Sequence, residues 1–245
     1  MKIEVVTAWY NEQILAPLFK RHYAFANRIH VLFDVDSDDR TEEYLSGLEV
    51  HPIKYPDGID WVIKSDAVNE LSNSLDADWV IAVDADEFVF PKGHHPYDTP
   101  FFLQKQEGNV IFCELHNVYR HHSDKDLIDD LPVPQRRHGN PIPGISYGQN
   151  QYIKPCVVKP ELQIRWTCGI HGFIANDKAR VNPINMVGAH WAMADPTIAL
   201  SRRLAQSKRQ SKNNLIHQRG YQNFNITKEE IEKELAEHLN DHLIF

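Results

Sequence analysis

One stretch of the chain joins a strand-like run to a group of carboxylates. The apolar run Trp79–Val83 has the length and composition of a strand buried on both faces. Asp84, Asp86 and Glu87 follow it directly. Strand side chains alternate, so Asp84 and Asp86 would point the same way and repel by about 4 kcal/mol at about 4 Å near a protein surface. A divalent cation that prefers oxygen ligands, Mn²⁺ or Mg²⁺, would remove this repulsion. The alternative is a strand that runs into an acidic, solvated turn.

The chain before this stretch alternates between strand-like and helical patterns. The expected strands are Ile3–Thr7, Ile29–Phe33, Val50–Tyr55 and Trp79–Val83, and the expected helices follow an N-cap at Asn11 and span Ile59–Leu75. This alternation predicts βαβ crossovers and a parallel sheet. Ligands bind at the carboxyl ends of such strands, so we expect Thr7, Asp34 and Asp84 to lie along one edge.

After Glu87 the alternation stops. Val110–Glu114 and Cys156–Lys159 resemble further strands, which we expect to pair antiparallel. The segment Leu131–Gly148 between them is rich in proline and glycine, which predicts a long loop. Loops of this length in a compact domain are usually functional or disordered.

The C-terminal part is predicted to be helical. Asp195-Pro196 should open a helix that runs to about Ser211. The segment Arg202–Arg219 carries several cations and no acid. We expect this basic block and the Leu131–Gly148 loop to close over an anionic ligand, with Arg202 and Arg203 nearest to it. The alternative is that the basic block faces a second subunit.

The last segment shows a helix start and an apolar stripe. Thr227 and Glu230 have capping-box spacing. The stripe should pack on the core or on a second copy of the chain, which leaves a homodimer possible. Its residues are Ile231, Leu235, Leu239 and Leu243.

Composition narrows the class of protein. A length of 245 residues suits one large domain or one domain with an appended part. The net charge of -8 argues against a nucleic-acid binder. The three cysteines form no CxxC pair, which indicates a reducing compartment rather than a disulfide framework. With no signal peptide and no membrane-spanning stretch in the sequence, we expect a soluble, cytoplasmic protein.

Several motifs together resemble the family 2-like glycosyltransferases of the GT-A type, most closely a bacterial subgroup with a D-x-D-E-F motif. The motifs, within roughly Ile3 to Lys212, are Thr7–Glu12, Phe33–Thr41, Asp84–Phe88, Lys154–Pro160, Gly169–His171 and His190-Trp191. Each is weak alone, but together and in the family's order they are fairly specific. Ala8 and Arg40 depart from the family pattern, where lysine and glycine are preferred.

The resemblance implies a fold and a reaction. The fold would be α/β: a GT-A-like mixed sheet with a Rossmann-like nucleotide-binding half at 1–91, an acceptor half at 92–212 and a helical tail at 213–245, in a single domain. The enzyme would move a sugar, as an inverting hexosyltransferase, from a nucleotide-sugar, a UDP-sugar in particular. The acceptor would be a hydroxyl of a glycan, a lipid-linked sugar or a cell-surface polysaccharide.

The resemblance also implies roles for individual residues. A divalent metal, Mn²⁺ rather than Mg²⁺ if a histidine takes part, would act as a Lewis acid on the leaving diphosphate. Its ligands would be Asp84, Asp86 and His190. The nucleotide-sugar would meet Thr7, Asn11, Glu12, Asp34, Lys64 and Asp84. Apart from the resemblance, His171 lies between Gly169 and Gly172, where the backbone can approach a ligand, so it is a candidate base for the acceptor hydroxyl, a substrate contact or a structural residue, and Glu114 is the rival base.

Rival classes are partly excluded by the same residues. A nicotinamide dehydrogenase would need a glycine-rich turn, and Thr7–Glu12 contains no glycine. A metal-dependent phosphohydrolase with an Asp-x-Asp nucleophile would carry the motif after its first strand and a small or β-branched residue where Phe88 stands. That class, and an inactive nucleotide-sugar or carbohydrate-binding module, remain as alternatives.

Overall fold

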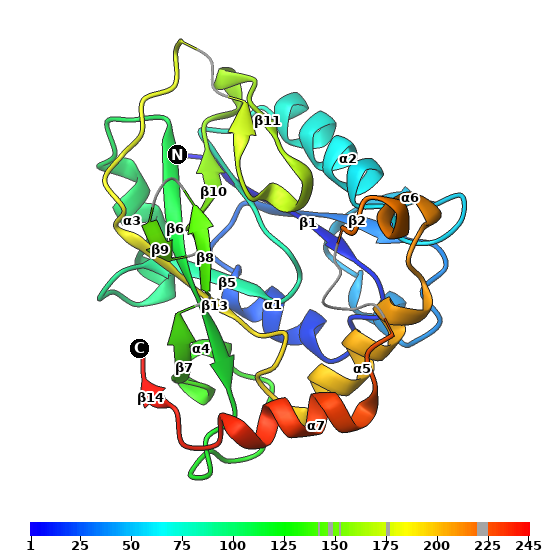
Figure 1. Cartoon of the computed structure of the whole chain (residues 1–245). Helices are drawn as coiled ribbons and strands as arrows, with labels where there is room; N and C mark the ends of the chain where they lie inside the picture. The colour runs from blue at the N-terminus through cyan, green and yellow to red at the C-terminus, as the bar shows by residue number, and fades with distance from the viewer. Residues whose placement is uncertain (142, 147–148, 152, 175–176, 220–224) are drawn as a thin grey trace.

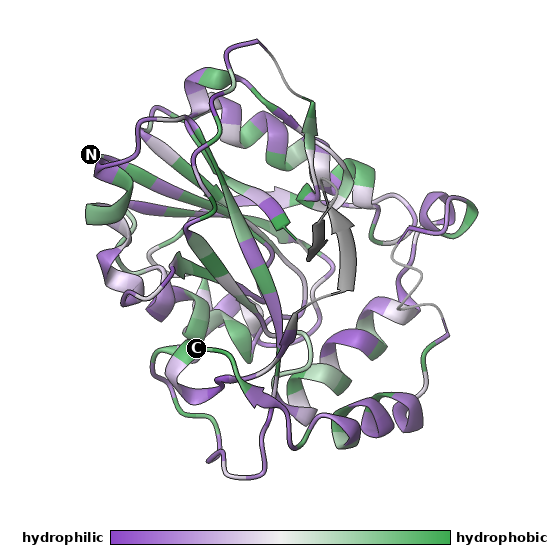
Figure 2. Cartoon of the chain, turned by 60° about the vertical axis from the view of Figure 1, so that its left-hand side comes forward, coloured by the Kyte–Doolittle hydropathy of each residue, from purple (hydrophilic) through white to green (hydrophobic). Residues whose placement is uncertain are grey.

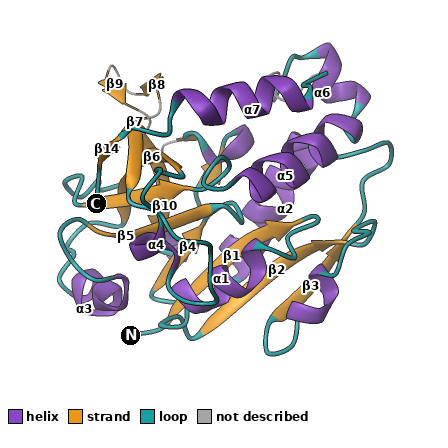
Figure 3. Cartoon of the chain, turned by 90° about the horizontal axis from the view of Figure 1, so that it is seen from below, coloured by secondary structure: helices purple, strands orange, loops and turns teal. Residues whose placement is uncertain are grey.

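The computed structural model describes residues 1–245 except 142, 147–148, 152, 175–176 and 220–224, and the side chains of 141–152 also lie outside the described part (Figure 1). The chain folds around one large mixed sheet with helices on both sides (Figure 3). The predicted fold class, α/β with a Rossmann-like half and C-terminal helices, is confirmed.

The first half of the sheet is parallel, as the alternation predicts. Its strands stand in the order β3-β2-β1-β4, which is the order of a Rossmann-like half. Their bounds are β1 Ile3–Trp9, β2 Arg28–Asp34, β3 Glu49–Ile53 and β4 Trp79–Ala82. The expected strands are therefore all present, with ends within a few residues of the predicted ones.

The second half of the sheet is mixed. Next to β4 the path runs through β10, β6, β7 and β14, each antiparallel to the last, while β13 lies antiparallel to β5 and parallel to β6. The bounds are β5 Glu87–Pro91, β6 Val110–Tyr119, β7 His138–Pro141, β10 Ile153–Val158, β13 Met186–His190 and β14 His242–Leu243. Shorter strands outside this path are β8 Pro143–Ser146, β9 Gln149–Gln151, β11 Arg165–Trp166 and β12 Phe173–Ile174.

Alternating side chains of the sheet build two cores, one on each face. Ile81 belongs to one core, with α1 (Leu15–His22), and its neighbours Val80 and Ala82 belong to the other, with α2 (Trp61–Ser74). Hydrophobic stretches accordingly follow the central strands, whereas the helices carry hydrophilic stretches on their outer sides (Figure 2). Strand β4 is buried on both faces, as its unbroken apolar run predicts.

Local capping signals place three helix starts. Asp60 accepts hydrogen bonds from the backbone N–H groups of Val62 and Ile63 and opens α2. Asp195 caps α5 (Pro196–Lys208), and Thr227 with Glu230 forms the predicted capping box of α7 (Lys228–Glu237). The other helices are η1 Thr41–Tyr44, η2 Pro96–Asp98, α3 Thr99–Gln104, α4 Pro132–Gln135, η3 Pro160–Leu162, η4 Cys168–Ile170 and α6 Lys212–Ile216.

Three expectations about the chain's course are wrong. Helix α1 begins four residues after Asn11, which has a left-handed φ of 55° and binds the next loop instead. The segment Leu131–Gly148 is not one long loop, because its described parts include α4, β7 and β8. The apolar stripe stops with α7: Leu239 and Leu243 are exposed, and only Ile231 and Leu235 are buried.

Within the described residues, no helix has both the length and the apolar character needed to cross a membrane.

Candidate functional site

The carboxyl ends of the parallel strands meet where the strand order reverses, between β1 and β4. The loop after β1 carries Asn11 and Glu12, and the turn after β4 carries Asp84 and Asp86. Asp34 ends the neighbouring strand β2. The structure thus brings most of the predicted polar residues to one edge of the sheet.

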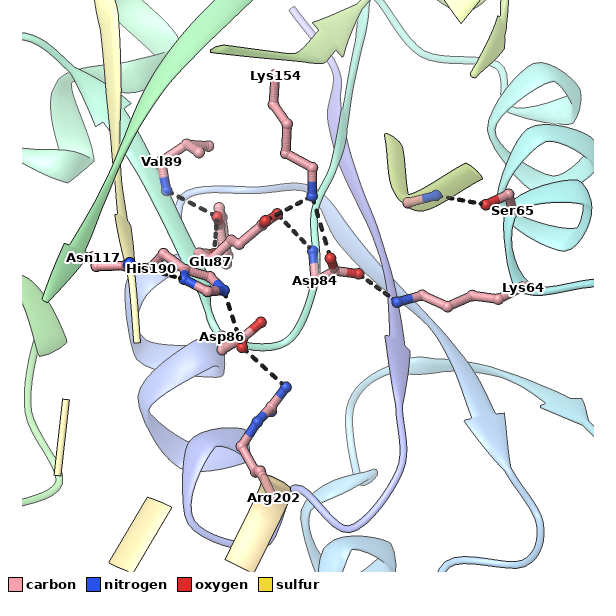
Figure 4. Close-up of polar contacts among 12 residues, drawn as sticks. Lys64, Ser65, Asp84, Asp86, Glu87, Val89, Asn117, Lys154, His190 and Arg202 are labelled. Atoms are coloured by element: carbon pink, nitrogen blue, oxygen red, sulfur yellow. Dashed lines mark hydrogen bonds and ion pairs between the residues drawn. The ribbon is translucent and has the colours of Figure 1, made fainter. Parts of the chain in front are cut away.

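Asp84 is held by two lysines (Figure 4). Lys64 of α2 lies 2.5 Å from its Oδ1, and Lys154 of β10 lies 3.2 Å from its Oδ2. Lys154 also lies 2.6 Å from Oε1 of Glu87 and has an exposed side-chain fraction of 1%. Burial alone would raise the pKa of Asp84, but Lys154 and Lys64 hold it well below its usual range. The two carboxylates and two ammonium groups form a closed cluster whose charges cancel.

Asp86 belongs to a different cluster. Its Oδ2 lies 3.1 Å from Nη2 of Arg202 in α5, and Arg202 also donates to Glu12. Burial raises the pKa of Glu12 to about 8, against the lowering effect of the Arg202 charge. With this pKa Glu12 is mostly protonated at neutral pH, so the charges of Asp86 and Arg202 balance. A cation bound at Asp86 would favour the ionised form of Glu12.

His190 points at Asp86 from β13. The strand pairs His190 with Glu87 of β5 on one side and with Asn117 of β6 on the other. Asn117 Oδ1 lies 2.7 Å from His190 Nδ1 and can only accept, so Nδ1 carries a proton and the neutral tautomer leaves the Nε2 lone pair for a ligand. Nε2 lies 3.5 Å from Oδ2 of Asp86 (Figure 4). A histidine whose other ring nitrogen is fixed in this way has the arrangement common in metal ligands.

The three expected metal ligands are not assembled as one group. No cluster of three or more His, Cys, Asp or Glu side chains suited to a metal ion occurs in the described part of the chain. The structure pairs each oxygen of Asp84 with a lysine, whereas it places Asp86 beside His190.

A cavity of about 700 Å³ opens beside the end of β2. Its lining residues are Tyr10, Asn11, Asp36, Asp38, Leu200, Ser201, Leu204, Ala205, Lys208 and Arg209. Asn11 joins the two strand-end loops by donating to Asp38 Oδ1 at 2.5 Å and accepting from the Asp38 N–H at 2.9 Å. Thr7, expected to flank a nucleoside, is fully buried inside β1, so Tyr10 takes that position at the cavity.

The two candidate bases, His171 and Glu114, have different surroundings. His171 follows the turn η4, and its ring lies against Gly169. The His171 side chain is exposed in part, yet surrounding protein atoms desolvate it and lower its pKa, while Asp84 and Glu87 act in the opposite direction. Glu114 pairs with Lys92 and His116. Along β6 it is three residues from Asn117, so their side chains take opposite faces and Glu114 points away from the site.

The arginines of the basic block form ion pairs with different carboxylates. Arg202 reaches Asp86, Arg209 reaches Asp34, and Arg203, expected near the anion, instead binds Glu234 at 2.7 Å. Arg136, in the segment expected to be an open loop, is 1% exposed and binds Asp195. Sequence reasoning also missed roles for Lys154 and Asn117. A lone lysine within the apolar run of β10 was the available signal for a buried ion pair.

No family model matches the chain, and no curated protein matches it. Among solved structures, TarS 1-349 of S. aureus in complex with UDP-GlcNAc is 14% identical with a TM-score of 0.41, over 98% of this chain and 72% of that chain. Glucosyl-3-phosphoglycerate synthase of Mycobacterium tuberculosis, in complex with Mn²⁺, UDP and phosphoglyceric acid, is 18% identical with a TM-score of 0.38, over 66% and 56%. The 4-diphosphocytidyl-2C-methyl-D-erythritol synthase of Anaerococcus prevotii is 13% identical with a TM-score of 0.39, over 96% and 97%. These likenesses are too low to assign a function to the chain.

Proposed function

We propose that this protein transfers a sugar from a nucleoside diphosphate sugar, a UDP-sugar in particular, to a hydroxyl group of a glycan or lipid-linked acceptor. One observation carries the proposal. At the switch point of a Rossmann-like sheet, acids suited to a nucleoside and a cation lie beside Lys64 and Arg202, which suit a diphosphate. A phosphohydrolase that uses Asp84 as nucleophile fits less well, because both oxygens of Asp84 are bound by lysines.

Asp86 and His190 would hold the divalent cation, Mn²⁺ in preference to Mg²⁺ because imidazole suits manganese better. When bound, such a cation supplies Lewis acidity to the leaving diphosphate. Lys64 would bind phosphate oxygens, and its neighbour Trp61 would keep it in place through a cation–π contact at 4.6 Å. The neutral imidazole of His171, whose pKa is lowered, could accept the proton of the acceptor hydroxyl.

Nucleotide binding tests the proposal directly. In a thermal-shift screen of UDP, CDP, GDP and ADP with and without Mn²⁺, we expect UDP with Mn²⁺ to give the largest rise in Tm. A ligand at a hundred times its Kd adds about 2.7 kcal/mol, which corresponds to roughly 5–10 °C for a chain of this size. If none of the four nucleotides raises Tm at millimolar concentration, the proposal is wrong. Release of UDP, rather than of inorganic phosphate, from a UDP-sugar would separate sugar transfer from phosphohydrolysis.

The turn before His171 offers a test of the proposed base. Gly169 has a φ of 73°, and a Cβ there would lie 2.5 Å from Nε2 of His171. Gly169→Ala should cost about 1–2 kcal/mol of unfolding free energy for the left-handed backbone and push the ring aside. We expect kcat for sugar transfer to fall about 100-fold, the lower end of the range for a positioned general base.

Gly93→Ala is the matched control. Gly93 has a φ of 75°, but nothing lies within 4 Å of its Cβ position. Urea unfolding should show a similar loss for both variants, whereas only Gly169→Ala should slow sugar transfer. Equal kcat values in the two variants would show that His171 is not the base of the reaction.

A further inference from the structure

The side chain of Arg209 lies in the place that a nucleoside would need. Its Nη1 lies 2.7 Å from Oδ2 of Asp34, and its Nη2 lies 3.4 Å from Oδ1 of the same carboxylate. The other hydrogen bond to Oδ1 comes from the backbone N–H of Asp36 at 3.0 Å. Asp34 is 2% exposed, so in this arrangement it has no oxygen left for a ligand.

The same guanidinium covers the aromatic surface of the cavity. Its Cζ lies 4.3 Å from the ring centroid of Tyr10, and its Nη2 lies 3.0 Å from Oδ2 of Asp36. A planar guanidinium that stacks on a ring and binds a carboxylate in two places uses the two contacts that a nucleobase with a ring N–H would use. Tyr10, Asp36 and Arg209 all line the cavity of about 700 Å³.

The backbone of Arg209 is fixed independently of its side chain. The N–H of Ile59 donates to the Arg209 carbonyl at 2.7 Å, and the N–H of Ser211 donates to the Ile59 carbonyl at 3.2 Å. Gly58 permits this approach, because a Cβ there would lie 2.6 Å from the Arg209 oxygen. The side chain can therefore leave Asp34 by rotation about its own bonds while the backbone stays in place.

We infer that Arg209 is an internal competitor for the nucleoside subsite, bound to Asp34 and Tyr10 until a nucleoside displaces it. The inference rests on the proposed function, since it concerns the donor's nucleoside. Competition of this kind lowers the apparent affinity by the fraction of molecules whose subsite is open. If Arg209 fills the subsite about 90% of the time, its removal should strengthen nucleoside binding about tenfold.

The test is a comparison of Arg209→Met with Arg203→Met by isothermal titration of uridine and of UDP, each with and without Mn²⁺. Arg203, six positions earlier, binds Glu234, so it is a control of the same chemistry outside the cavity. Arg209→Met should bind both ligands about tenfold more tightly than wild type. Arg209→Lys cannot bind the carboxylate in two places, so its affinity for both ligands should lie between those of wild type and Arg209→Met. Arg203→Met should match wild type.

The possible results separate the inference from the proposed function. Unchanged uridine binding in Arg209→Met, or weaker UDP binding, would overturn the inference, because Arg209 would then be a bystander or a contact of the phosphates. If neither the wild-type protein nor any variant binds uridine or UDP, the proposed function itself fails. Thermal unfolding of Arg209→Met checks that the variant is folded, and Arg209→Lys decides the matter if it is not.

Discussion

Replacing Asp86 with asparagine should lower kcat/KM for sugar transfer at least about 100-fold and weaken Mn²⁺ binding by a similar factor. A catalytic metal ligand supplies several kcal/mol, and each 1.36 kcal/mol is about tenfold in rate. Asparagine keeps the shape of Asp86 but removes its negative charge, which a cation beside His190 would need. UDP release measures the rate, and electron paramagnetic resonance of free Mn²⁺ measures the affinity without the reaction.

Asp84→Asn should behave differently from Asp86→Asn. Because Lys64 and Lys154 already offset the charge of Asp84, its replacement should weaken Mn²⁺ binding much less than Asp86→Asn does. Asp66→Asn, at an exposed ion pair between α2 and Arg165 of β11, is the control for removal of a surface charge. Equal loss of Mn²⁺ affinity in Asp84→Asn and Asp86→Asn would make Asp84 a ligand after all. Unchanged affinity in Asp86→Asn would contradict the metal assignment.

The parts of the structure that depend on neighbouring residues could be predicted from the sequence. Apolar runs such as Trp79–Ala82 need only their own composition to indicate a buried strand. The capping box at Thr227 and the Asp195-Pro196 helix start are equally local. The convergence of Asp34 and Asp84 follows from the parallel sheet, whose strand ends share one edge.

The contacts that define the site could not be predicted in this way. Asp84 and Lys154 are 70 residues apart, and Asp34 and Arg209 are 175 apart, so no local pattern connects them. Asn11 shows the same limit, because its side chain binds Asp38 of the next loop rather than capping the helix that follows it. The sequence thus indicates which acids reach the edge, whereas the sheet's long-range pairing decides which cation each acid meets.

Glu114 shows the same limit, because alternation along a strand does not say which of the two faces it takes. Strand β6 carries Cys113 and Leu115 in the core that includes α1, so Glu114 must take the other face. Lys154 pairs with Cys113 across the sheet and therefore shares the face of the site. The choice between Glu114 and His171 as base depended on knowing the strand register.

Replacing Lys154 with methionine should lower the free energy of unfolding by about 3–5 kcal/mol at pH 7, or Tm by roughly 6–20 °C. Methionine fills much of the same volume but leaves Asp84 and Glu87 as buried carboxylates that have lost their shared cation. Lys233→Met, which removes an exposed lysine 3.9 Å from Glu237, should cost less than about 0.5 kcal/mol. Urea unfolding of the two variants beside wild type gives both values.

The pKa shifts of Lys154 and Asp84 determine how their contribution to stability changes with pH. The pKa of Lys154 is raised despite burial, so its contribution is complete below the usual lysine pKa and is lost only as pH rises through the raised value. The pKa of Asp84 is lowered, so its contribution is complete above the usual aspartate pKa and is lost only as pH falls through the lowered value. The contribution of this cluster to the free energy of unfolding of the wild-type protein should therefore be constant between about pH 5 and pH 9.

In Lys154→Met, Asp84 loses one of the two charges that keep it ionised, so its pKa should rise. Lowering the pH then protonates it and relieves the buried charge, and the difference from wild type should shrink between pH 7 and pH 4. A difference that stays constant over this range would mean that the loss comes from packing rather than from charge. A loss no larger than that of Lys233→Met would mean that Lys154 does not hold Asp84 in place, and Asp84 would again be available to a metal.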